Sequence, residues 1–260
     1  KFGSYTATQS IAAGTAYASY TIPLSWLAAI PNATSGAATV MLETLDTSGT
    51  SLGSYSYGFT ITAPSSVAPT ISSVTASPVN DNSVISGWGI YVYAKSKAQI
   101  KINGAAGAYG STIRSYSITT SPNVGSASAA SYTTGLLYSS GTITVTAKVT
   151  DSRGRTATKT TTFSVYAYSA PYFSSVESYR CTSSGARDDV GGTYARIKAT
   201  FGRSTLNGSN NVSCQLTMTQ IGGSYSTAAT LTSGTAVILG GGNLAVGASY
   251  NVTLTLTDTV

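Results

Sequence analysis

Residues 38–62 read ATVMLETLDTSGTSLGSYSYGFTIT and align with residues 141–165, GTITVTAKVTDSRGRTATKTTTFSV. The first part of this pattern returns at residues 250–260 as YNVTLTLTDTV. Apolar and polar residues alternate in each copy, which is typical of an antiparallel strand with one buried face. A short polar turn and a second strand follow in the first two copies, which predicts β-hairpins. The strands end at Asp46, Asp151 and Asp258, and the residues expected to face a core are Val40, Leu42, Thr44, Val145, Ala147, Val149, Val252, Leu254 and Leu256.

A second repeated phrase gives the length of the repeat. Residues 68–74, APTISSV, return as APYFSSV at residues 170–176, an offset of 102 residues (170 − 68). Repeats of about 100 residues made of strands and turns indicate immunoglobulin-like or fibronectin-like β-sandwiches. We therefore predict an all-β fold of tandem sandwiches arranged as an extended rod, with proline-stiffened linkers. The expected domains are residues 1–66 (a partial sandwich without its start), 67–168 (a complete sandwich) and 169–260 (a sandwich without its last strand).

The composition argues against an enzyme. Charged residues make up 8% of the chain, and histidine is absent. The lack of histidine excludes Ser-His-Asp and Cys-His catalysis and histidine-ligated zinc. The few acidic residues form no facing pair of the kind that a glycosidase needs. We therefore expect no catalytic residue, no metal and no cofactor, and no membrane partner, because no apolar window is long enough to span a bilayer.

One segment departs from the strand pattern. In residues 23–31, PLSWLAAIP, the apolar residues have helical spacing and a proline stands at each end. Proline is tolerated in the first turn of a helix and also ends one. We expect a single helical turn that caps the end of a sandwich, with Trp26 partly buried.

The longest aromatic run is GWGIYVYAKSK at residues 87–97. Read as one strand, it places Trp88, Ile90, Val92 and Ala94 on a core face, with Trp88 as the core tryptophan of a sandwich. The opposite face is then a candidate surface for contact with a glycan or with another subunit, because tyrosine rings stack on sugars and lysines donate hydrogen bonds. A cross-strand aromatic ladder is the alternative explanation. The candidate contact residues are Tyr91, Tyr93, Lys95, Lys97 and Lys101.

Most of the positive charge lies in the middle repeat. Residues 67–168 contain eight lysines and arginines and two aspartates, which gives +6. Such a patch can attract anionic polymers such as teichoic acid or nucleic acid. Positive side chains at strand edges also keep a protein soluble and prevent sheets from pairing. Solubility is the interpretation that we favour.

Two acidic neighbours and two cysteines are further candidates. Asp188 and Asp189 lie in a glycine-rich stretch without the spaced oxygen ligands of a calcium loop, so we favour a turn tip paired with a nearby arginine. Cys181 and Cys214 could form one disulfide in oxidising surroundings.

Several stretches resemble a known family. They are TIPLSWLAAIPNATSG at residues 21–36, ATVMLETLDTSGTSLGS, FTITAPSSVAPTISSV, GIYVYAKSKAQIKINGAAGAYGSTIRSYSI and VTAKVTDSRGRTATKTTTFSVYAYSAPYFSSVESYRC. Together they are similar to the repeated region of minor structural tail proteins from siphophages of Gram-positive bacteria, over about residues 10–200, and more loosely beyond. The resemblance implies a virion tail component with immunoglobulin-like modules, near the baseplate or in a host-contacting fibre, without a catalytic motif.

We therefore expect a tail fibre or baseplate-associated structural protein of a phage virion, a rigid spacer that supports attachment to the host. The expected partners are other tail proteins, further copies of the chain, and host cell-wall polysaccharide or teichoic acid, but not nucleic acid. Assembly in the host cytoplasm favours free, buried thiols for both cysteines. A bacterial surface adhesin or stalk, and the carbohydrate-binding region of a secreted hydrolase, are alternatives with the same fold.

Overall fold

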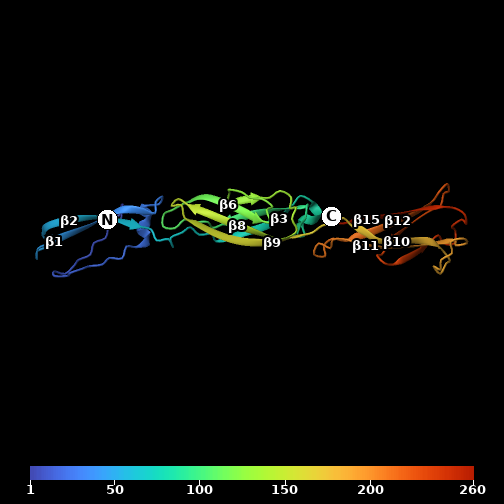
Figure 1. The fold of residues 1–260 in the computed structure, drawn as a ribbon, viewed down its shortest axis with the longest axis horizontal. Helices are drawn as coiled ribbons and strands as arrows, with labels where there is room; N and C mark the ends of the chain where they lie inside the picture. The colour runs from blue at the N-terminus through green and yellow to red at the C-terminus, as the bar shows by residue number, and fades with distance from the viewer. The chain divides into compact units, whose positions relative to one another are not determined.

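The computed structural model describes residues 1–260, and almost all of its regular secondary structure is β-strand (Figure 1). Strands contain 49% of the residues and helices 4%, so the all-β prediction is confirmed. No helix is long and apolar enough to cross a membrane. The chain forms two compact units, the first made of residues 1–77, 97–135 and 142–163 and the second of residues 78–96, 136–141 and 164–260. The immunoglobulin-like type, the rod and the three domain boundaries stay predictions.

The first predicted hairpin is confirmed, but its predicted burial is wrong. Strands β1 (Ser35–Leu45) and β2 (Ser51–Thr62) pair antiparallel, with Val40 opposite Tyr57. Val40 and Leu42 are 53% and 59% exposed, and Thr44 is exposed as well. The reason is that β1 and β2 form a two-stranded sheet of their own. A strand buries an apolar face only where a second layer covers it.

The second hairpin, at Asp151, behaves as predicted. Strands β8 (Gly141–Asp151) and β9 (Thr156–Tyr166) are neighbours in a sheet of order β4-β9-β8-β6, with β4 at Tyr91–Val92 and β6 at Ile113–Ser121. Val145, Ala147 and Val149 are fully buried. A second sheet has the order β3-β5-β7, with β3 at Ser73–Asn80, β5 at Ser96–Asn103 and β7 at Ser131–Thr133.

The last six strands form two sheets that pack face to face. The orders are β10-β11-β14 and β13-β12-β15. Ile197 and Ala199 of β11 share one core with Leu216 and Met218 of β12. Leu254 and Leu256 pack against this core, but Val252 is 36% exposed, so burial along β15 is weaker than expected. The bounds are Tyr172–Cys181 (β10), Tyr194–Gly202 (β11), Val212–Gln220 (β12), Ser226–Leu231 (β13), Ala236–Leu239 (β14) and Tyr250–Asp258 (β15).

The predicted helical turn is confirmed. It is a 3-10 helix, η1 (Leu24–Ala29), preceded by Pro23 in an extended conformation. Trp26 is half-buried and its ring lies 5.9 Å from that of Tyr5 and 6.1 Å from that of Tyr20, between centroids.

The predicted strand over residues 87–97 is wrong. A short helix, α1 (Ser83–Ser86), precedes this segment, β4 contains only Tyr91 and Val92, and β5 begins at Ser96. Between them Ala94 has a φ of 55°, and the amide of Lys95 donates to the carbonyl of Val92, which closes a turn. The chain therefore reverses where the alternation predicted a continuous strand. Tyr91 and Val92 are both buried, so neighbouring residues do not face opposite environments.

Candidate functional site

The turns that follow Asp46 and Asp151 are each shaped by the aspartate's own side chain. Oδ1 of Asp151, which is fully buried, accepts hydrogen bonds from the amides of Arg153 (3.0 Å) and Arg155 (2.8 Å). Oδ1 of Asp46 accepts in the same way from the amides of Ser48 (2.9 Å) and Thr50 (2.7 Å). Aspartate is favoured in turns because its carboxylate can bond to its own backbone two residues on. The two arginines thus occupy the turn positions that a serine and a threonine hold in the first copy.

The guanidinium of Arg153 binds four backbone carbonyls. Nε donates to the carbonyl of Ile30 (3.1 Å) and Nη2 to that of Leu27 (2.8 Å), at the end of η1. Nη1 donates to the carbonyl of Ala108 (2.5 Å) and Nη2 also to that of Tyr109 (2.6 Å). The last carbonyls of a helix have no partner within the helix, and a guanidinium offers five donors in a fixed plane. Arg153 therefore ties the helical turn before β1 to the loop between β5 and β6.

Arg155 binds the linker that follows β2. Its Nη1 donates to the carbonyls of Pro64 and Val67 (2.5 Å to the latter), and its Nη2 donates to that of Ala63 (2.5 Å). Ser152 adds a hydrogen bond of 2.5 Å from its hydroxyl to the carbonyl of Pro31. We call Arg153 and Arg155 together the arginine clasp. Every acceptor of the clasp is a main-chain oxygen.

An apolar cluster lies beside the clasp. Leu27 and Val67 contribute to it from the two segments that the clasp holds, and Ala108 packs against it. Burial lowers the pKa of Arg153, while the carboxylate of Asp151 acts in the opposite direction. Arginine stays protonated in proteins, so the clasp is cationic. The buried members of the cluster are Phe2, Leu27, Ala38, Ile61, Ala63 and Val67.

The third repeated aspartate, Asp258, lies in the second unit, where an apolar cluster takes the place of the arginine clasp. The carboxylate of Asp258 accepts from the hydroxyl of Tyr168 (3.2 Å) and from Nδ2 of Asn210 (3.0 Å). Val260 stands two residues after Asp258, as Arg153 does after Asp151, and its amide lies 3.4 Å from Oδ1. Its side chain joins a cluster with no arginine. The cluster contains Ile85, Val92 and Leu206, with Trp88, Ile90, Tyr168 and Val260 packed against it.

This cluster corrects the prediction for Trp88. The residue was expected to lie in the core of a sandwich, on a strand. It follows α1 instead, where its amide donates to the carbonyl of Ile85 (3.1 Å), and its half-buried ring packs in the cluster around Val260.

The structure does not arrange the five predicted contact residues as one strand face. Tyr91 is 7% exposed, and burial raises its pKa to about 12. Tyr93 is half-buried and packs edge-on against the exposed ring of Tyr138, with 6.1 Å between centroids. Nζ of Lys95 lies 5.3 Å from the ring centre of Tyr168. Lys97 is half-buried and Lys101 exposed, and both lie on β5. A contact role for these five residues stays a prediction.

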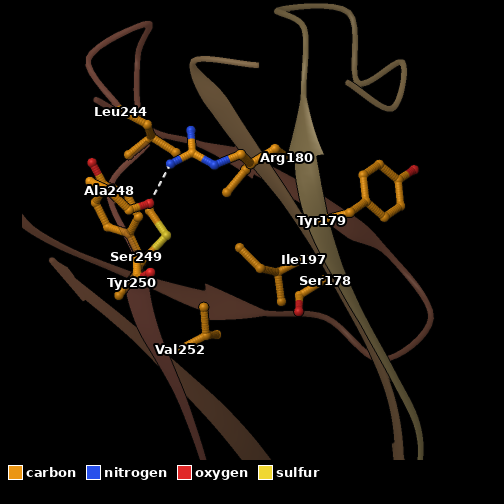
Figure 2. A pocket seen from close by; sticks show the side chains of 11 residues that line it. Ser178, Tyr179, Arg180, Ile197, Leu244, Ala248, Ser249, Tyr250 and Val252 are labelled. Atoms are coloured by element: carbon orange, nitrogen blue, oxygen red, sulfur yellow. Dashed lines mark hydrogen bonds between the residues drawn. The ribbon is translucent and has the colours of Figure 1, made fainter. Parts of the chain in front are cut away.

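A pocket of about 340 Å³ opens between β10 and β15 (Figure 2). Arg180 points into it and donates to the carbonyls of Gly192 (2.8 Å), Ala245 (2.9 Å) and Ala248 (2.7 Å). Figure 2 shows the side chain of Tyr179 on the opposite face of β10, turned away from the pocket. We call this the edge pocket. Its lining is Ser178, Tyr179, Arg180, Ala195, Ile197, Met218, Leu244, Ala248, Ser249, Tyr250 and Val252.

The remaining sequence candidates have structural explanations. Nε of Arg187 lies 2.7 Å from Oδ2 of Asp189, and Asp188 accepts from the amide of Gly191, which agrees with the turn-tip interpretation. Cys181 and Cys214 are free and fully buried, as expected, and burial raises the pKa of both thiols.

Sequence reasoning missed the arginine clasp. From the sequence, Arg153 and Arg155 were interpreted only as contributions to the net charge of the middle repeat. The alignment of the hairpins contained a usable signal, because Arg153 replaces Ser48 and Arg155 replaces Thr50 after an unchanged aspartate. No sequence feature indicated that their acceptors would be main-chain carbonyls.

The whole chain matches one known protein family. The family model described as "Siphovirus protein of unknown function (DUF859)" matches residues 1–260. The match includes the last sixty residues, where the resemblance to tail proteins was looser. The comparison with curated proteins found no match. The family supports the siphophage part of the resemblance and is silent on immunoglobulin-like modules and on a minor tail role.

We predict that Arg153→Met lowers the free energy of unfolding of the first unit by about 3 kcal/mol, because four carbonyls lose a charged donor in a largely buried place. Arg114→Met is the matched control, since Arg114 lies exposed on β6 and its loss should change stability by about 0.5 kcal/mol or less. Chemical denaturation followed by the fluorescence of Trp26 measures both. Equal stability of the two variants would contradict a stabilising role for the clasp.

We predict that Tyr91 makes the fold sensitive to alkali. The unfolded chain releases this proton near the ordinary pKa of 10.0, and the folded chain near 12. A pKa raised by folding gives stability that is complete below pH 10 and declines as pH rises toward 12. Between pH 9 and pH 11, Tyr91→Phe should therefore lose about 1 kcal/mol less than the wild type. Tyr138→Phe, at a 64% exposed position, should lose as much as the wild type. Chemical denaturation at pH 9 and pH 11 measures these losses of stability. An equal loss in Tyr91→Phe and the wild type would contradict the prediction.

Proposed function

The chain belongs to this family of siphovirus proteins, and we propose that it is a structural component of the phage tail. Within the tail it acts as a fibre or baseplate-associated spacer, in which immunoglobulin-like sandwiches follow one another and hold a host-contacting element in position. The arginine clasp is the observation that carries this proposal. It joins segments on either side of a linker that would otherwise be free to bend.

The clasp suits a spacer because of how its hydrogen bonds are distributed. Arg153 and Arg155 project from one hairpin turn and reach η1, the linker after β2 and the loop after β5. Bending at the linker would break several charge-assisted hydrogen bonds at once. Loss of one such hydrogen bond costs about 1.5–3 kcal/mol of stability when the carbonyl gains no other donor. A linker that served only as a tether would need none of them.

The second unit repeats the same plan with different chemistry. Val260, two residues after Asp258, packs in the cluster that contains Ile85 of α1 and Leu206. The carboxylate of Asp258 itself accepts a hydrogen bond from Tyr168. In both units, the residue two positions after the aspartate contacts a segment that comes earlier in the chain. Repetition of one type of joint supports an array of modules more than a single module with an extension.

Attachment to the host follows from several copies acting together. Each copy needs only weak affinity for a cell-wall polymer, because many copies on one tail raise the effective concentration. Tyr93, Tyr138 and Lys95 provide aromatic and cationic groups for such contacts, and the excess of lysine and arginine favours anionic polymers such as teichoic acid.

The first test is the location of the protein. We expect its peptides in purified particles of the siphovirus that encodes it, and in the tail fraction after heads and tails are separated. Quantitative mass spectrometry of the two fractions measures this, with the major capsid and tail-tube proteins as internal references. Detection only in infected-cell lysate, or only with heads, would contradict a tail component.

The second test is stiffness. Spin labels at Ser48→Cys and Lys148→Cys, both exposed positions of the first unit, should give one narrow distance distribution in pulsed electron resonance. The distribution should broaden when Arg153 and Arg155 are both replaced by Met, and should stay narrow in Arg114→Met. The native thiols are fully buried and do not compete for label. A distribution that is already broad in the otherwise unchanged chain would reject the spacer while leaving a tail location possible.

A further inference from the structure

We propose that the outer face of β6 and β8 binds a polyol-phosphate chain, with Arg114 and Lys148 each holding one of its phosphates. This site rests on the proposed function, because its ligand is the anionic cell-wall polymer that a tail spacer meets at the host surface. It uses residues other than Tyr93, Tyr138 and Lys95.

The register of β6 against β8 places hydroxyl side chains on the outer face of the sheet. The odd-numbered residues of β8 from Ile143 to Val149 are fully buried, so the even-numbered ones face outward. Ser115 of β6 lies opposite Thr150, and Ser117 lies opposite Lys148. The hydroxyl face, as we name it, consists of Arg114, Ser115, Ser117, Thr146, Lys148 and Thr150.

A β-bulge brings Arg114 onto the hydroxyl face. The pairing changes from Ile113 opposite Asp151 to Ser115 opposite Thr150, so Arg114 is an extra residue without a partner on β8. Bulges re-aim a side chain in this way. Arg114 is exposed, whereas Asp151 is fully buried, so the guanidinium lies on the outer side of the sheet.

The charge of the hydroxyl face selects an anion. Lys148 is exposed and stands diagonally across from Ser115, the residue next to Arg114. Diagonal neighbours in an antiparallel pair are about 7–8 Å apart, so the two cations can hold adjacent phosphates of one flexible chain. The single carboxylate on β6, β8 and β9 is that of Asp151, which is buried and bonded to the amides of its own turn. Both cations are therefore available to phosphate oxygens.

The other residues of the hydroxyl face favour a polyol chain over a nucleic acid. Serine and threonine hydroxyls both donate and accept hydrogen bonds, which matches the hydroxyls of a polyol. Tyr116, the one aromatic residue of β6 and β8, lies opposite Val149 on the inner side of the sheet. Proteins that hold single-stranded nucleic acid stack its bases on aromatic rings. A chain of polyols and phosphates has no bases to stack.

The cation at position 148 belongs to the middle repeat alone. The residue three positions before the hairpin aspartate is Glu43 in the first copy, Lys148 in the second and Thr255 in the third (46 − 43 = 151 − 148 = 258 − 255). One strand position thus carries a negative, a positive and a neutral side chain in the three copies. Lys148→Thr therefore tests the charge with a residue that the same strand pattern already contains.

The test measures the affinity of the protein for a short synthetic glycerol-phosphate oligomer by isothermal titration calorimetry at low salt. We expect saturable binding that weakens about fivefold in Lys148→Thr, and at least about tenfold when Arg114→Met is added, because each change removes one phosphate contact. Arg187→Thr removes one positive charge from the second unit, at a side chain that is 67% exposed, and should leave the affinity unchanged.

Salt dependence separates loss of a phosphate contact from a change in structure. Lys148→Thr should reduce the slope of log affinity against log salt concentration by about 0.7, and Lys148→Arg should keep both the affinity and the slope. Three results would each overturn the proposal: equal affinity of the double variant and the unchanged protein, equal affinity for a single-stranded DNA oligomer of the same charge, or no binding by the unchanged protein. None of these results bears on the tail location, which the fractionation of particles measures separately.

Discussion

A buried carboxylate at the tip of a hairpin is the constraint on which the first unit depends. Asp151 has no exposed surface, and its Oδ1 holds the amides of Arg153 and Arg155 within 3.0 Å. The turn that results leaves both arginine side chains free to extend toward earlier parts of the chain. The same turn at Asp46 carries Ser48 and Thr50, which are too short to reach so far. The aspartate therefore sets the shape of the turn, and the residues after it decide what the turn can hold.

The two joints use opposite chemistry at equivalent positions. Arg153 places a cation among carbonyl oxygens, whereas Val260 enters an apolar cluster with Ile85 and Leu206. A cation bound to main-chain oxygens requires directional geometry, while apolar packing depends mainly on shape and area. The position two residues after the repeated aspartate thus makes a polar contact in one unit and an apolar contact in the other.

Regular alternation of apolar and polar residues made the strands predictable. The long-range partners of those strands could not be predicted from it. The hairpins at Asp46 and Asp151, strand β15 and the helical turn around Trp26 follow from local patterns that the structure retains. Burial of Val40 and Leu42 could not be read from alternation, because it requires a second sheet over β1 and β2. The prediction of one continuous strand around Tyr91 was wrong because α1 precedes this aromatic run and a turn at Ala94 interrupts it. The clasp depends on carbonyl positions that side-chain identities do not encode.

The acceptors of the clasp are all main-chain oxygens, and this has a consequence for how such a protein can evolve. A carbonyl is present whatever side chain the residue carries, so Ile30, Ala108 and Tyr109 can be exchanged without removing a hydrogen-bond acceptor. Substitution of the residues that the clasp holds therefore leaves its hydrogen-bond acceptors in place, provided that the aspartate and the two arginines are kept.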